Sequence, residues 1–162
     1  MVLRLLKQAG LLLMMVVAGT LIDWGVHSAY GPWYVEGEYY LNKIIFGTAF
    51  GVAGYYALKH ILGVRTLRGM VWGVPAVIAA ILQTKYFYQG RDPGFVVFFL
   101  FGHYLMFLPG SWYIFRKYPG VFLGPQDAAP GGRLHWARFF IFAVAVEALF
   151  AGYFTAQYGW VW

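Results

Sequence analysis

The sequence predicts an all-α membrane protein with five transmembrane helices in one bundle. Only 11% of its 162 residues are charged, whereas soluble domains carry roughly a quarter. The mean hydropathy is +0.62 and 22% of the residues are aromatic, more large apolar surface than one small water-soluble core buries. Five apolar stretches reach the roughly 20 residues that a helix needs to cross a bilayer core. We therefore expect residues 1–162 to form a single transmembrane domain.

Segments rich in glycine and proline separate the five apolar stretches. The expected spans are about 9–29, 41–61, 70–88, 94–115 and 137–160. The first resembles a signal peptide, with basic residues before it and small residues after it, but we interpret it as a retained span. The third is the weakest, because Pro75 lies near its start and Lys85 near its end. The fourth is rich in phenylalanine, and the fifth carries one acid, Glu147.

Basic side chains predict how the bundle is oriented. With a cytoplasmic N-terminus, the inner side receives Arg4, Lys7, Lys59, Arg65, Arg68, Arg116, Lys117, Arg133 and Arg138. The outer side then receives Lys43, Lys85 and Arg91. Because cytoplasmic loops carry the excess of Lys and Arg, we expect the N-terminus inside and the C-terminus outside. The net charge of +6 then reflects loops facing anionic lipid, and we expect no nucleic acid as a partner.

The composition also excludes several chemistries. The sequence contains no cysteine, which excludes disulfides, thiolate metal sites, iron–sulfur clusters and covalent haem attachment. The GxSxG, P-loop and GxGxxG motifs of other enzyme classes are absent from the sequence, as is an acidic cluster for a magnesium pyrophosphate site. The remaining candidates are ionisable residues inside the predicted spans.

Small residues in the second span predict close helix packing. Gly47 and Gly51 form a GxxxG pair, and glycines four residues apart lie on one helix face, where two backbones approach closely. The pair favours packing inside the bundle, with self-association of two chains as the alternative. The aromatic stretch at 30–40 is interpreted as part of the interfacial belt, with a lid over a polar site as the alternative.

The ionisable residues of the spans gather in the outer half of the expected bundle. Each costs about 2.5–3.5 kcal/mol at the bilayer centre and so needs a partner or a function. Asp23 and His27 lie one turn apart in the first span, Lys43 lies near the start of the second, and His103 lies within the fourth. Glu147 is expected near the midplane.

Three interpretations of this polar group stay open. In the first, Asp23, His27 and His103 bind a metal such as copper or zinc, since carboxylate and imidazole suit both ions. In the second, Asp23 and His27 form an acid–base or proton-relay unit while Lys43 or Lys85 binds an anionic group. In the third, Asp23 hydrogen-bonds His27 and neutralises a lysine, with a structural role only.

The sequence leaves three functions to weigh. The leading hypothesis is a small accessory subunit of a larger membrane complex, of a respiratory or other redox type. The alternative is a membrane-embedded metal-dependent or acid–base enzyme, with Asp23, His27, Lys43 and Glu147 as candidate catalytic residues. The second alternative is a proton-coupled small-molecule transporter with His103 and Glu147 as its relay.

Overall fold

The computed structural model describes residues 2–29, 37–87 and 93–124, and across these ranges all of the regular structure is helical. The elements are α1 (Val2–Ala29), α2 (Gly37–Tyr56), the π-helical turn η2 (Ala57–Ile61), α3 (Leu67–Phe87), α4 (Pro93–Lys117) and the short α5 (Pro119–Phe122). The prediction of an all-α fold is confirmed for this part of the chain.

Each of the first four predicted spans falls on a long helix. Within the described ranges, α1 is the one helix long and apolar enough to cross a membrane by length and composition. A buried core helix or an N-terminal signal sequence would meet the same criteria. The apolar part of α3, Leu67–Leu82, is shorter. The predicted fifth span, 137–160, lies outside the described residues, and α5 is a separate four-residue helix.

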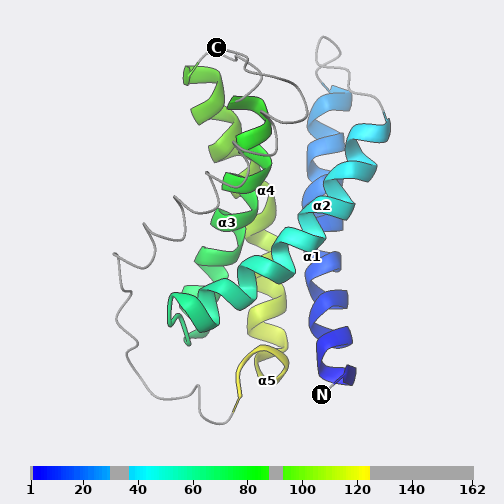
Figure 1. The fold of residues 1–162 in the computed structure, drawn as a ribbon. Coiled ribbons are helices and arrows are strands. Elements are labelled where there is room, and N and C mark those ends of the chain that lie inside the picture. The colour runs from blue at the N-terminus through cyan, green and yellow to red at the C-terminus, as the bar shows by residue number, and fades with distance from the viewer. Residues whose placement is uncertain (1, 30–36, 88–92, 125–162) are drawn as a thin grey trace.

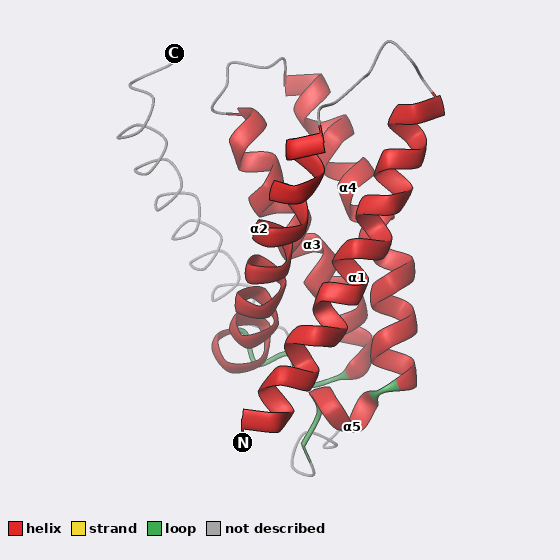
Figure 2. Ribbon diagram, turned by 90° about the vertical axis from the view of Figure 1, so that its right-hand side faces the viewer, coloured by secondary structure: helices red, strands yellow, loops and turns green. Residues whose placement is uncertain are grey.

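The four long helices run alternately up and down (Figures 1 and 2). Helix α1 packs against α2 and α4, and α3 packs against the same two helices. Helix α5 contacts α1 and α4 at the end of the bundle where α1 begins (Figure 1). We call this the α5 end. The opposite end, where α1 finishes and α2 starts, is called the far end.

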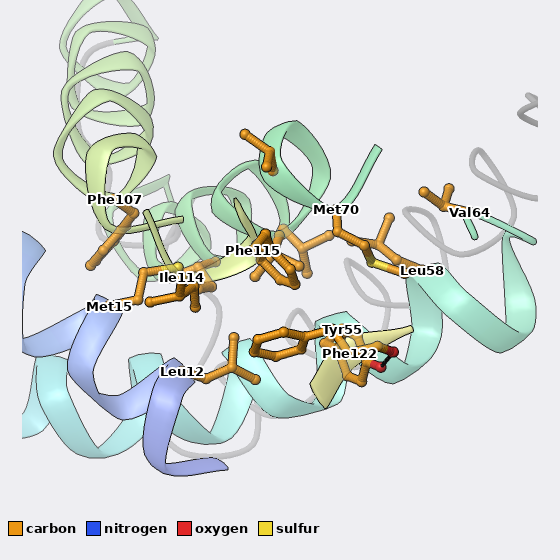
Figure 3. Packing of buried hydrophobic residues seen from close by; sticks show 14 of the residues in the cluster. Leu12, Met15, Tyr55, Leu58, Val64, Met70, Phe107, Ile114, Phe115 and Phe122 are labelled. Carbon is orange, nitrogen blue, oxygen red and sulfur yellow. Dashed lines mark hydrogen bonds between the residues drawn. The ribbon is translucent and has the colours of Figure 1, made fainter. Parts of the chain in front are cut away.

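Apolar side chains from all four long helices fill the centre of the bundle toward the α5 end (Figure 3). The ring of Phe122, from α5, lies 4.4 Å from that of Phe115 and 5.4 Å from that of Tyr55, between ring centroids. All three side chains are fully buried. The core thus ties α5 to α2 and α4.

Glycines allow the helices to approach closely. A Cβ atom built on Gly47 would lie 3.0 Å from the Val16 side chain of α1, and one on Gly51 would lie 3.2 Å from Ile78 of α3. One on Gly110 of α4 would lie 3.2 Å from the Cα atom of Met15. The GxxxG pair of α2 therefore makes its close contacts inside this chain.

Polar and apolar side chains are arranged unusually for a water-soluble bundle. Among the residues whose side chains the structure describes, the buried polar ones are Gln8, Thr20, Asp23, Lys43, His103 and Ser111. Large apolar side chains are exposed on all four long helices, among them Trp24, Phe46, Trp72, Phe101 and Trp112. Two charged side chains, Asp23 and Lys43, thus lie inside the bundle, while several tryptophan and phenylalanine side chains are exposed on its surface.

Candidate functional site: a buried polar network

An ion pair between α1 and α2 forms the centre of the candidate site. The inward face of α1 repeats every three or four residues, so Asp23 follows Val16, Gly19 and Thr20 on the buried side of the helix. Asp23 and Lys43 are only 2% and 4% exposed, and Lys43 Nζ donates to Asp23 Oδ2 at 2.6 Å. The charges neutralise each other, as a buried pair must.

His27 lies one helical turn after Asp23 and contacts its other carboxylate oxygen. The distance from His27 Nε2 to Asp23 Oδ1 is 3.6 Å. The His27 side chain is 11% exposed, against 3% for that of Asp23. The i,i+4 spacing seen in the sequence thus brings both side chains together, with the imidazole on the side nearer to the surface.

Tyr39 connects this ion pair to α4. It lies one turn before Lys43 on α2, and its hydroxyl accepts a hydrogen bond from Lys43 Nζ at 3.5 Å. The same hydroxyl lies 3.4 Å from Nε2 of the buried His103. A phenol hydroxyl can accept and donate at once, so Tyr39 joins the lysine to the imidazole. We define the polar network as His27, Asp23, Lys43, Tyr39 and His103.

Aromatic rings surround the charged centre of the network. Lys43 Nζ lies 5.4 Å from the ring centroid of Tyr39 and 5.7 Å from that of Phe107. The His27 ring packs edge-on against Tyr39 and Tyr40, at centroid distances of 6.2 and 6.4 Å. Such rings stabilise a buried cation through their π-faces and keep the local dielectric low.

The structure therefore brings together four of the residues singled out in the sequence. Asp23, His27 and Lys43 are in direct contact, and His103 joins them through Tyr39. Glu147 and the side chain of Lys85 lie outside the described part of the chain. Sequence reasoning missed Tyr39, although its four-residue spacing from Lys43 was a usable signal.

The copper or zinc interpretation gains no support from this geometry. Among the described residues, no group of three histidine, cysteine, aspartate or glutamate side chains lies close enough to hold a metal ion. Asp23 Oδ2 is bound by the Lys43 ammonium group at 2.6 Å, and Oδ1 faces the His27 imidazole. What the arrangement can do chemically is share protons along a row of hydrogen-bonding groups.

A second polar cluster lies at the α5 end. Gln8 of α1 is buried and donates to the Val121 carbonyl at 2.8 Å. Tyr55 donates to the Phe122 carbonyl, which also accepts from Lys59 of η2 at 3.0 Å. These donors satisfy carbonyl groups at the end of α5 that have no partner within the helix. Sequence reasoning did not anticipate this cluster.

Comparisons of the chain with protein-family models, with curated proteins and with solved structures give no match.

Proposed function

We propose that this chain is a multi-pass integral membrane protein, with α1 to α4 across the bilayer and the α5 end facing the cytoplasm. The observation that carries the proposal is the buried Asp23–Lys43 pair inside a bundle whose surface carries exposed tryptophan and phenylalanine. Soluble monomers rarely expose large apolar patches, whereas lipid-facing helices need them. Glycine-mediated helix contacts fit the same environment.

The charges at the α5 end support this orientation. Arg116 lies over the Trp112 ring at 4.7 Å, and Lys117 lies over the Tyr113 ring at 5.0 Å. Basic groups resting on aromatic rings at a helix end are typical of the membrane interface. Lys7 and Arg65 lie exposed on neighbouring elements of this end, as the positive-inside rule requires of a cytoplasmic face.

Within the membrane, we propose that the chain serves as a small accessory subunit of a larger assembly. The buried charges at the far end, Asp23 and Lys43, are paired with each other, and exposed apolar side chains lie on all four long helices. Lipid alone would also cover such a surface, so a photo-reactive amino acid at exposed Trp72 or Phe46 tests the subunit role. We expect a cross-link to one distinct membrane protein. A stable monomer with its own turnover would exclude the accessory role.

A proton-transfer role is the second candidate, because Tyr39 joins the ion pair to His103. Both the acid–base enzyme and the proton-coupled transporter require groups that exchange protons inside the membrane. The row of contacts from His27 to His103 supplies such groups. The partner that would complete the relay in the transporter hypothesis, Glu147, lies outside the described residues.

The absence of cysteine allows a clean test of the membrane topology. Single cysteines are introduced at Lys7, Gly37 and Arg65, three exposed positions, and intact cells are treated with a membrane-impermeant maleimide. We expect Gly37→Cys to react in intact cells, and Lys7→Cys and Arg65→Cys to react only after permeabilisation. The cysteine-free protein is the control. Reaction of all three positions from the same side would overturn the proposed arrangement.

A further inference from the structure

We infer that the polar network is a proton path that leads from the far-end surface of the bundle to His103. The path runs through His27, Asp23, Lys43 and Tyr39 in that order. It specifies the chemistry of the second candidate function. It rests on contacts within this chain, and it holds whether or not the chain joins a larger assembly.

Each polar group on the path lies within 3.6 Å of the next. Successive polar atoms lie 3.6 Å apart between His27 and Asp23, and 2.6 Å apart between Asp23 and Lys43. The next two separations, Lys43 to Tyr39 and Tyr39 to His103, are 3.5 and 3.4 Å. Only the contact between Asp23 and Lys43 has the length of an ordinary hydrogen bond, so proton transfer along the path requires side-chain motions that shorten the other three contacts. The path therefore needs no large rearrangement of the helices.

Exposure gives the path a direction. His27 retains an exposed part of its side chain near the end of α1, while Asp23, Lys43 and His103 are almost fully buried. A proton from water can thus reach the His27 imidazole directly. Inside the bundle, the next acceptor that it meets is the Asp23 carboxylate.

The proton transfers balance without any further reactant. His27 takes a proton from water and passes it to the Asp23 carboxylate. The Lys43 ammonium then gives a proton to the Tyr39 oxygen, while the Tyr39 hydroxyl gives its own proton to His103 Nε2. Asp23 finally returns its proton to the Lys43 amine. One proton has moved from water to His103, a hydroxide ion is left in the water, and the other four groups regain their protonation states.

Within the described ranges, the titratable groups that contact one another along this path come from three helices. Helix α1 contributes Asp23 and His27, α2 contributes Tyr39, Tyr40 and Lys43, and α4 contributes His103 itself. Phe107 lines the other side of the Lys43 ammonium and cannot exchange a proton. Among these groups, Tyr39 has the one hydroxyl in contact with both Lys43 and His103.

Substitution of Tyr39 by phenylalanine tests the path directly, because it removes the hydroxyl and keeps the ring. The chain has four histidines, so ¹⁵N-histidine-labelled protein in nanodiscs gives a simple NMR spectrum, and His103→Gln assigns the His103 signal. The quantity measured is the exchange rate with water of the proton at His103 Nε2, the nitrogen that faces the Tyr39 hydroxyl. In Tyr39→Phe we expect it to fall about tenfold or more, since the hydroxyl that links His103 to the buried ion pair is lost.

Tyr40→Phe is the matched control, because it removes a hydroxyl from the neighbouring residue, whose ring contacts His27. We expect exchange at His103 to stay within about twofold of the wild type in this variant, because no step of the path uses that hydroxyl. Substitution of His27 by leucine should slow the exchange as Tyr39→Phe does. Unchanged or faster exchange in Tyr39→Phe, with helicity retained, would overturn the path and leave the cysteine-labelling test of the membrane topology unaffected.

Discussion

The two polar clusters of the bundle differ in what accepts their hydrogen bonds. At the α5 end, Gln8, Tyr55 and Lys59 donate to the backbone carbonyls of Val121 and Phe122. At the far end, ionisable side chains from three helices contact each other. Carbonyl groups do not titrate, whereas carboxylate, ammonium and imidazole groups do.

This difference separates a structural cluster from one with chemical potential. The α5-end donors satisfy carbonyls that would otherwise be buried without partners, and that requirement fully explains them. Burying Asp23 and Lys43 gains little stability, since a buried ion pair roughly balances its own desolvation cost. Stability therefore accounts for the α5-end cluster better than it accounts for the buried ion pair at the far end.

The largest expected effect comes from breaking the far-end ion pair. Lys43→Met leaves the Asp23 carboxylate buried without the cation that contacts it at 2.6 Å. We expect the free energy of unfolding to fall by about 3–5 kcal/mol, because the remaining charge is uncompensated. Unfolding in mixed detergent micelles, followed by circular dichroism, measures the loss.

The double variant Asp23→Asn/Lys43→Met is the control for this prediction. It removes both charges, so most of the lost stability should return. If the double variant is as unstable as Lys43→Met alone, packing of the lysine stem rather than its charge holds the two helices together.

A smaller effect is expected at Gly19, which packs against an aromatic ring beside the polar network. A Cβ atom on Gly19 would overlap the Phe107 ring, which lies beside Lys43, whereas one on Gly102 would meet no atom within 4 Å. Gly19→Ala should therefore cost about 1–3 kcal/mol of stability through overpacking. Gly102→Ala should be neutral or gain up to about 1 kcal/mol from helix propensity. Equal effects in detergent unfolding would show that the α1–α4 contact tolerates a larger separation.

The sequence predicted the far-end cluster better than the α5 end, for a physical reason. Charged residues such as Asp23 and Lys43 stand out in apolar helices, and the four-residue spacing of Asp23 and His27 placed them on one face. Tyr39 did not stand out, because it lies in an aromatic stretch typical of a membrane interface. Its four-residue spacing from Lys43 places both side chains on one face of α2, but its contact with His103 depends on how α2 meets α4, which no local pattern records.

The α5-end cluster had no comparable signal in the sequence. Its acceptors are the backbone carbonyls of Val121 and Phe122, and every residue has a carbonyl group. The donor Gln8 was not distinguished from the polar start of the first span. The first four helices were predictable from apolar length, since each falls on a predicted span. The short α5 was not, because four residues carry no periodicity.

The smallest expected effect on stability gives the most direct comparison of the two clusters, because it compares the same substitution at Tyr55 and at Tyr39. Tyr55→Phe removes the hydroxyl that donates to the Phe122 carbonyl and that accepts a long contact of 3.4 Å from Gln8 Nε2. However, Lys59 still donates to the Phe122 carbonyl at 3.0 Å. We expect a loss of about 0.5–1.5 kcal/mol in the free energy of unfolding, the usual value for one hydrogen bond. Exchange of the His103 imidazole proton should not change.

Tyr39→Phe should show the reverse pattern. We expect exchange at His103 to slow and the free energy of unfolding to change little, because the Tyr39 hydrogen bonds, at 3.4 and 3.5 Å, are long and contribute little to stability. If both variants change only the free energy of unfolding, or both change the exchange rate at His103, the two clusters have the same role. The far end then has no separate chemical role.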